Sequence, residues 1–321
     1  MKLASKKLSL AITAIVLVAF IAYFLLNIEK FRPLLHVNIG LLFLIALADM
    51  ISIGVNGLFT KAILVPFKKS IGFMESYYVS LISTVGNFFA PVGAGFAFRA
   101  VYLKKKHSLP YSEYVSTLSG NYILVFLVSS ILGLVSLFLL RDDATPQLLT
   151  LAVVFSLLLV MSLILSLIKL PLFKVDSVQN KYLRRIGRIL FRIINGWNKI
   201  TSNKALLLKL FGLTLANAVL SFILIWLIIM SLHLTVTFPA LLLLSVLGTL
   251  SLFINITPAN LGIKEAIYIF SSGVLGFTVS QIILIALIDR GIVFLVLLGL
   301  WLFFGKIHKQ SAVLTENSKS S

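Results

Sequence analysis

Long apolar runs constrain the fold of this chain more than any other feature of its sequence. A helix that spans a bilayer needs about 20 mostly apolar residues, and six stretches are of this kind: 9–26, 38–59, 118–140, 148–168, 208–231 and 281–304. Only 12% of the residues are charged, about half the share usual in soluble domains. The pattern predicts an all-α, polytopic integral membrane protein with six to eight transmembrane helices.

Two further apolar stretches, 74–98 and 238–278, contain residues that interrupt helices. The interrupting residues are an asparagine, prolines and glycines in each stretch: Asn87, Pro91, Gly93 and Gly95 in the first, and Asn255, Pro258 and Gly262 in the second. A broken helix leaves backbone polar groups unpaired, so at membrane depth it must face protein or a water-filled cavity.

The two interrupted stretches hold corresponding places in two halves, about 38–140 and 208–304. Asp49 precedes Pro91 by 42 residues and Asn217 precedes Pro258 by 41, and each lies inside a long span. The spans 38–59 and 208–231 are expected to run in opposite directions, which predicts an inverted repeat with a transport site at its centre. Chance is the alternative, because Pro and Gly are common in membrane helices. One transmembrane domain is expected over 1–310, with a disordered tail at 311–321.

The basic residues predict the orientation of the chain. Its net charge is +18, and 23 of its 28 Lys and Arg residues fall on one side if 74–98 dips into the membrane and returns. Basic residues gather on the cytoplasmic side. Both termini are therefore expected in the cytoplasm, with 74–98 as a re-entrant segment in the plasma membrane. This distribution also accounts for the high net positive charge, so no nucleic-acid partner is expected.

The linker 169–207 is the one long loop, and it carries a basic amphipathic pattern. Its apolar residues follow helical spacing, and the other face is basic: Lys181, Arg184, Arg185, Arg188 and Arg192. Such a helix is suited to lie on an anionic leaflet. An ordinary cytoplasmic connector is the simpler interpretation, and a role in gathering lipid headgroups is the other.

Charged and polar residues at membrane depth are the candidates for substrate binding. Asp49, Ser52 and Asn56 form one stripe, which either lines a cavity or joins two helices by hydrogen bonds. Glu265 either caps a restarting helix or pairs with Arg290, the preferred partner. The complete set of candidates is Asp49, Asn56, Asn87, Arg99, Asn255, Glu265 and Arg290.

Several chemistries find no support in the sequence. There is no cysteine, and the four histidines are scattered, so neither a metal site nor a cofactor is expected. No Walker A motif, nucleotide fingerprint or nucleophile elbow is present. We therefore expect no enzymatic activity and no ATP-driven transport by this chain alone.

The spacing of these residues resembles a known family, the lysylphosphatidylglycerol synthase transmembrane region, over about 8–305. The matching residues are Asn87, Pro91, Gly93, Gly95 and Arg99, then Pro258, Gly262 and Glu265, and finally Arg290. The family includes the flippase half of the multiple peptide resistance factors. Those proteins carry a soluble aminoacyl-transferase domain after the membrane region, and this sequence ends at Ser321 without one. The identity of the lipid is therefore open.

The resemblance implies flippase-like translocation of a phospholipid or lipid-linked precursor. Arg99 and Arg290 would then contact the phosphate, while Asp49 and Glu265 would hold the arginines or contact a cationic headgroup. Three alternatives remain: a scaffold for a separately encoded synthase or glycosyltransferase, an integral-membrane enzyme acting on lipid phosphates, and a transporter of small solutes.

Overall fold

The computed structural model describes Leu25 and residues 28–90, 93–140, 145–167, 181–254 and 256–317, and these residues form helices and no strand. Five of the described helices are long and apolar enough to cross a membrane. This confirms the all-α membrane fold. The predicted span 9–26 lies outside the described residues except for Leu25, and Pro91 and Asn255 also lie outside them.

The 3-10 helix η1 (Ile28–His36) is followed by the long helix α2 (Ile39–Ile63). A short turn, η2 (Val65–Phe67), leads to α3 (Phe73–Phe89), α4 (Ala94–His107) and α5 (Tyr111–Leu139). Helices α6 (Pro146–Leu167) and α7 (Lys181–Thr201) follow.

The second half starts with α8 (Lys204–Ser231) and α9 (Phe238–Ser251). The turns η4 (Leu252–Ile254) and η5 (Pro258–Asn260) separate α9 from α10 (Ile263–Phe270). A single turn, α11 (Ser272–Leu275), precedes α12 (Val279–Asn317).

Helices α2 and α8 begin in the same way. Asn38 caps α2 by accepting hydrogen bonds from the amides of Gly40 and Leu41, and Asn203 caps α8 by accepting one from Leu206. An asparagine side chain satisfies backbone N–H groups that the first turn of a helix leaves unpaired. Each half therefore opens with a capped long helix before its broken segment.

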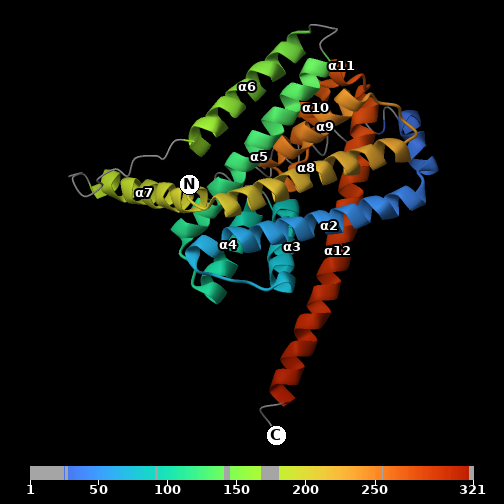
Figure 1. Ribbon diagram of the computed structural model, residues 1–321. Helices are drawn as coiled ribbons and strands as arrows, with labels where there is room; N and C mark the ends of the chain where they lie inside the picture. The colour runs from blue at the N-terminus through green and yellow to red at the C-terminus, as the bar shows by residue number, and fades with distance from the viewer. Residues whose placement is uncertain are drawn as a thin grey trace.

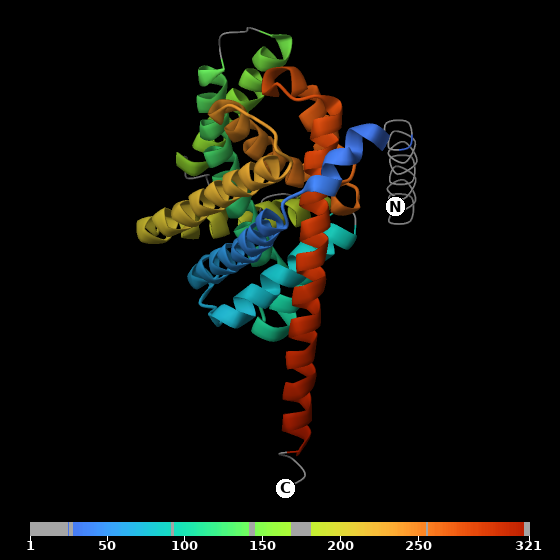
Figure 2. The same cartoon turned by 90° about the vertical axis from the view of Figure 1, so that its right-hand side faces the viewer.

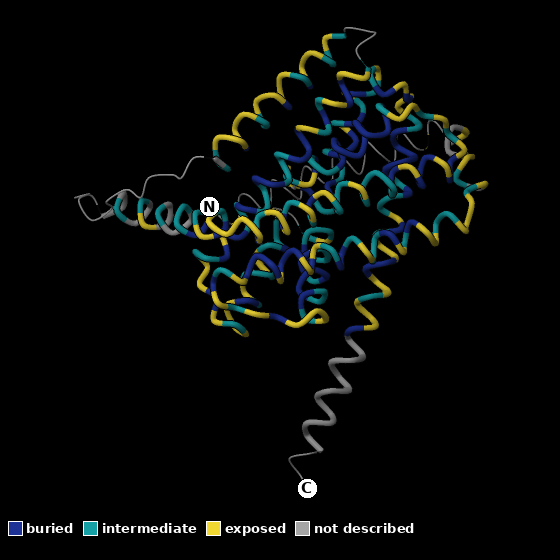
Figure 3. The backbone as a smooth tube through the Cα atoms, viewed as in Figure 1, coloured by how far each residue is buried: buried dark blue, intermediate teal, exposed yellow. Residues whose placement is uncertain are grey.

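Helices α2 and α8 pack side by side and run antiparallel, as the colour gradients in Figures 1 and 2 show. Helix α5 packs against α6, α7 and α9, and α12 crosses α2. The main apolar core lies between α8, α9 and the first part of α12. In Figure 3, exposed residues recur along α6, and many are large and apolar, such as Leu149, Val153 and Leu157. Lipid is the natural surrounding for such a face.

Helix α7 confirms the predicted helix in the linker and shows how it is anchored. Trp197 is 3% exposed, and its Nε1 donates a hydrogen bond of 2.7 Å to the Leu165 carbonyl. Its ring contacts Gly120 of α5 closely enough that a methyl group there would lie 2.9 Å from it. The end of α7 is thus docked on the helical bundle, while Arg188 near its middle is exposed.

Two predicted boundaries were wrong. Helix α5 begins at Tyr111 and not at 118, because its polar first turns are covered: Tyr114, Ser116 and Thr117 are all buried. The disordered tail was expected from 311, whereas α12 continues to Asn317. Residues such as Gln310, Ala312 and Leu314 favour helix, and the apolar part of α12 supplies the nucleus from which it extends.

Candidate functional site

The first broken segment is a tight helical hairpin of α3 and α4. The Asn87 side chain accepts a hydrogen bond of 3.0 Å from the amide of Gly95, which starts α4 beside the end of α3. A Cβ atom at Gly95 would lie 1.8 Å from the Ser83 carbonyl oxygen, so only glycine allows this approach. Gly93 adopts a left-handed φ of 66°, which glycine tolerates without strain. Asn87 was predicted to bind substrate, and in this structure its side chain joins α3 to α4 by a hydrogen bond.

The base of the hairpin shows that the chain returns to the end where it started. Glu75, in the first turn of α3, lies 3.0 Å from Lys106 Nζ and 2.7 Å from His107 Nε2, both in the last turn of α4. Tyr102 donates a third hydrogen bond of 3.0 Å to it. Burial alone would raise the pKa of Glu75, but these hydrogen bonds outweigh it and lower the pKa below its ordinary value.

The second broken segment contains three residues with left-handed backbone conformations. Ala259, Asn260 and Gly262 have φ angles of 51°, 54° and 81°. For alanine and asparagine this region costs about 1–2 kcal/mol each. The Asn260 side chain offsets part of this cost by donating to the Ser251 carbonyl at 2.9 Å and to the Ser251 hydroxyl at 3.0 Å.

Arg290 of α12 holds the second broken segment in place. Its Nε donates to the Ala259 carbonyl and its Nη2 to the Asn260 carbonyl, both at 3.1 Å. The guanidinium also forms a two-point ion pair with the Glu265 carboxylate. The preferred Glu265–Arg290 pair is present. The predicted phosphate contact of Arg290 stays a prediction, and in this structure the guanidinium is engaged by the protein itself.

Glu265 satisfies both interpretations offered by the sequence. Besides pairing with Arg290, its Oε2 accepts a hydrogen bond of 2.9 Å from the Gly262 amide and so caps α10. A second ion pair joins the same two helices, α10 and α12: Lys264 Nζ lies 2.7 Å from Asp289 Oδ2. Sequence reasoning missed this pair, although the adjacent charges in Lys264-Glu265 and Asp289-Arg290 gave the signal for it.

The polar stripe of α2 joins two helices, as one of its two interpretations predicted. Ser52 donates to the Asn217 side-chain oxygen at 3.4 Å, and Asn217 donates to the Asn56 side-chain oxygen at 3.2 Å. These contacts link α2 to α8, the two helices that would correspond in the predicted inverted repeat. Asp49, one turn earlier, takes no part in this seam and lies within electrostatic range of Lys264 and Asp289.

Arg99 of α4 differs from Arg290 in having no carboxylate partner among the described residues. Its Nε is buried without a hydrogen bond, and so is the nearby Tyr114 hydroxyl. Both side chains line a cavity of about 10 Å³ between α2, α4 and α5, together with Thr60, Thr117 and Asn121. This volume is enough for about one water molecule.

The two broken segments meet in the centre of the fold. Helix α3 packs against η5, and the Tyr122 ring of α5 contacts Phe96 at 5.9 Å and Phe253 at 4.8 Å between centroids. Phe96 follows the first break and Phe253 precedes the second. A displacement of one broken segment would therefore press directly on the other.

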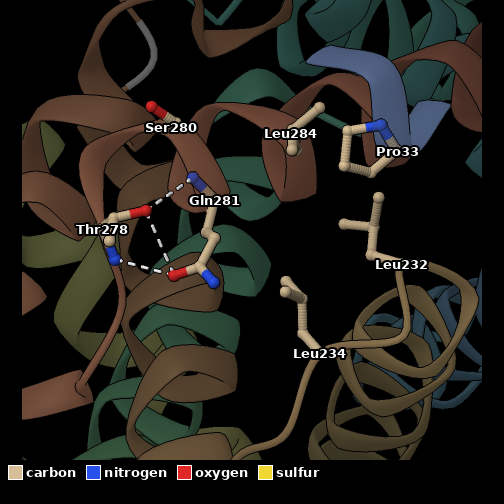
Figure 4. A pocket seen from close by; sticks show the side chains of 7 residues that line it. All are labelled: Pro33, Leu232, Leu234, Thr278, Ser280, Gln281 and Leu284. Carbon is tan, nitrogen blue, oxygen red and sulfur yellow. Dashed lines mark hydrogen bonds between the residues drawn. The ribbon is translucent and has the colours of Figure 1, made fainter. Parts of the chain in front are cut away.

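A larger cavity of about 370 Å³ lies elsewhere, at the start of α12. Figure 4 shows Pro33, Leu232, Leu234 and Leu284 lining it, and the Gln281 side-chain oxygen accepts hydrogen bonds from the Thr278 amide and hydroxyl. It contains no charged side chain and none of the predicted site residues. The described residues also hold no group of three His, Asp or Glu side chains able to bind a metal ion.

Comparison with known proteins adds one finding. A family model, described as Lysylphosphatidylglycerol synthase TM region, matches residues 8–300. No curated protein and no solved structure matches the chain. The matched range includes both broken segments and every charged residue discussed above.

Proposed function

We propose that this chain, which belongs to the Lysylphosphatidylglycerol synthase TM region family, translocates an anionic phospholipid or lipid-linked precursor across the cytoplasmic membrane. The observation that carries the proposal is Arg99. Lys264 and Arg290 are each paired with a carboxylate. Arg99 alone among these three has its charge uncompensated by a carboxylate of the described protein.

An arginine at membrane depth is costly, so its retention without an acidic partner points to an anion from outside the protein. A guanidinium can bind the oxygens of a phosphate with two parallel hydrogen bonds. The Tyr114 hydroxyl and the Asn121 and Thr117 side chains line the same cavity and would add neutral hydrogen bonds. This set of groups suits a phosphodiester headgroup better than a metal or a nucleotide.

The headgroup must reach Arg99 by a movement of the surrounding helices, because the present cavity is too small for a phosphate. In the proposal the α3–α4 hairpin re-enters the membrane from the cytoplasmic side, with Lys104, Lys105 and Lys106 at that surface. The basic residues of α7, of which Arg188 is exposed, would concentrate anionic lipid there, at about 1 kcal/mol for each basic side chain near the leaflet. The acyl chains would stay in the bilayer throughout.

Inverted halves provide a means of alternating access. The antiparallel helices α2 and α8 are joined through Ser52, Asn56 and Asn217, and the two broken segments touch around Tyr122. Rocking of one half against the other around such a centre is how inverted repeats expose a site to each side in turn. The Arg99 cavity lies between elements of the first half, where such rocking would open it.

The test is leaflet exposure of labelled lipids in proteoliposomes that contain the purified protein. Anionic phospholipids, an aminoacylated phospholipid and a polyprenyl-phosphate sugar are compared. Wild type is expected to equilibrate one class, and Arg99→Gln to slow it about tenfold or more, since a charged hydrogen bond contributes about 1.5–3 kcal/mol. Arg99→Lys should lose most of the rate as well, because an ammonium cannot form the two-point contact.

Arg32→Gln is the matched control, because this side chain is 75% exposed in η1. It should move lipid at the wild-type rate. Equal rates for wild type and Arg99→Gln would refute the assigned role of Arg99. If wild type moved no lipid class at all, a scaffold for a separately encoded synthase or glycosyltransferase would be the better proposal.

A further inference from the structure

Two partly buried carboxylates, Asp49 and Asp289, lie on helices that cross. Asp49 is the eleventh residue of α2 and Asp289 is the eleventh of α12, counting from Ile39 and Val279. At 1.5 Å per residue, each is about 15 Å from the start of its helix, in the interior of a span. Helices α2 and α12 pack against each other (Figures 1 and 2), and Asp49 lies within electrostatic range of Asp289 and Lys264.

The charges of this region do not balance. Lys264 pairs with Asp289, and Arg290 pairs with Glu265, so α10 and α12 together contribute no net charge here. Asp49 is the one carboxylate of this region without a paired charge, because it has no hydrogen bond or ion pair with any described residue. Ser52 and Asn56, on the same face of α2, are engaged with Asn217. A partly buried carboxylate in this position must be neutralised by something that it binds.

A proton fits this position better than a metal cation. The Lys264 ammonium, 11% exposed at its side chain, would repel a second cation next to Asp49. The described residues also offer no group of acidic or histidine ligands around it. Na⁺ or Ca²⁺ would need several oxygen ligands, whereas a proton needs only the carboxylate.

The buried hydroxyl of Tyr268 is a second observation that points to a change of partners at the Lys264–Asp289 pair. The residue is 0% exposed, and its hydroxyl has no hydrogen-bond partner in the described structure. The hydroxyl lies against Gly248, beside the Lys264 side chain, and within electrostatic range of Asp289. A buried hydroxyl without a partner is costly, unless it receives one when Lys264 or Asp289 changes position.

We propose that Asp49 and the Lys264–Asp289 pair form a proton-binding site that couples lipid movement to a proton gradient. Asp49 carries the proton in the described conformation. When the halves rock, Asp49 releases this proton to water, and the Lys264 ammonium moves from Asp289 to the ionised Asp49. Asp289 then takes up one proton from the opposite side, and the resulting neutral carboxyl accepts a hydrogen bond from Tyr268. This proton passes to Asp49 when Lys264 returns to Asp289, which restores the starting state. The proton-binding site is inferred from the positions of Asp49, Lys264, Asp289 and Tyr268 alone. The coupling of proton binding to lipid movement rests on the proposed function.

Few ionisable groups from the neighbouring helices act on Asp49: Lys264 of α10 and Asp289 of α12 lie within electrostatic range of it. The same two helices also carry Glu265, Tyr268 and Arg290. Tyr77 of α3 donates its hydroxyl to the adjacent Met50 carbonyl at 3.2 Å. Helix α8 presents Asn217, and its only ionisable residues, Lys204 and Lys209, lie in its first two turns. None of these is a histidine, so the carboxylates of Asp49 and Asp289 are the groups expected to exchange the proton.

Infrared pH-difference spectroscopy of the reconstituted protein tests proton binding without any lipid transport. Wild type should show the C=O stretching band of a protonated carboxylic acid, and this band should be lost in Asp49→Asn. In Asp49→Glu it should remain at a shifted frequency, which shows that the variants fold. Glu113→Gln, a matched change at the start of α5, should leave the band unchanged. A band that persists in Asp49→Asn would overturn the assignment.

Lipid movement under an imposed pH gradient tests the coupling. A gradient of one unit can support a leaflet ratio of up to about tenfold per proton, and we expect wild type and Glu113→Gln to approach it. Asp49→Asn should give a ratio of about one. If wild type moves lipid to a ratio of one regardless of the gradient, coupling is wrong while the proposed function stands. If wild type moves no lipid, the proposed function fails and the coupling fails with it, while the infrared band still decides whether Asp49 binds a proton.

Discussion

At the scale of single residues, Gly95 is a position where the fold has no room for a side chain. A Cβ atom there would lie 1.8 Å from the Ser83 carbonyl and 2.6 Å from the Asn87 side-chain oxygen. Gly95→Ala should therefore force α3 and α4 apart and destabilise the protein by at least about 1–3 kcal/mol. Thermal unfolding in detergent, followed by tryptophan fluorescence, measures this loss.

Gly212→Ala is the control for that substitution. Gly212 lies within α8, and a Cβ atom there meets nothing within 4 Å. Since alanine favours helix over glycine by about 1 kcal/mol, this variant should unfold at the wild-type temperature or above it. Equal unfolding temperatures for Gly95→Ala and Gly212→Ala would contradict the close approach of α3 and α4.

The Glu265–Arg290 pair allows a double-mutant cycle. Arg290→Gln leaves the buried Glu265 carboxylate without its ion pair, which should cost about 3–5 kcal/mol. Glu265→Gln keeps an acceptor for the Gly262 amide, so it removes the charge and spares the helix cap. The double variant should be less destabilised than the sum of the two single variants. Strict additivity in chemical unfolding would show that the ion pair contributes nothing.

Contacts between residues could be predicted from the sequence where a side chain had few candidate partners. Glu265 and Arg290 were matched correctly because few opposite charges lie at membrane depth. The Lys264–Asp289 pair was not predicted, because the turn of η5, which precedes α10, could not be foreseen from the sequence. That turn depends on left-handed φ angles at Ala259 and Asn260, which are uncommon for alanine above all. It also depends on backbone carbonyls that Arg290 satisfies from another helix.

At the scale of elements, the base of the α3–α4 hairpin should depend on pH. The pKa of Glu75 is held below its ordinary value of 4.5 by His107, Lys106 and Tyr102, against the opposing effect of burial. A carboxylate with a lowered folded pKa stabilises the fold above its unfolded pKa, and this contribution is lost as pH falls through the folded value. Wild type should therefore unfold at a higher temperature than Glu75→Gln at pH 7, with the difference shrinking below pH 4.5.

Glu29→Gln serves as the control for this pH series, because its side chain is 83% exposed. It should follow the wild-type unfolding temperature at every pH. A constant difference between wild type and Glu75→Gln from pH 7 down to pH 3 would mean that the Glu75 charge does not hold the hairpin.

Elements were predicted well where apolar length alone decides them. Helices α2, α6, α8 and the start of α12 lie close to their predicted ranges, since about 20 apolar residues have few other options. The interrupted segments were harder, because their helices end at specific contacts. Helix α4 starts where Asn87 accepts from Gly95, and α10 starts where Glu265 accepts from Gly262. Such contacts depend on the position of the preceding helix and not on local sequence.

At the scale of the whole molecule, the two halves share a plan and differ in chemistry. Each has an Asn-capped long helix, a broken segment and a further span, and the long helices cross antiparallel. The second half neutralises its charges internally through two ion pairs, whereas the first keeps Arg99 and Asp49 without such pairs. In our proposals, this difference in charge leaves Arg99 for an anion and Asp49 for a proton.

The absence of cysteine from the sequence makes the topology directly measurable. Ser70, Ser108, Ser202 and Thr235 are exposed and lie between helices, so each can be replaced singly by cysteine. A re-entrant hairpin places Ser70 and Ser108 on the same side of the membrane, as the contacts of Glu75 with Lys106 and His107 suggest. In intact cells, a membrane-impermeant maleimide should label only Thr235→Cys. The other three should react after permeabilisation. Labelling of Ser108→Cys in intact cells would instead mean that α3 and α4 together cross the membrane, which would move the lysines of α4 to the outer face.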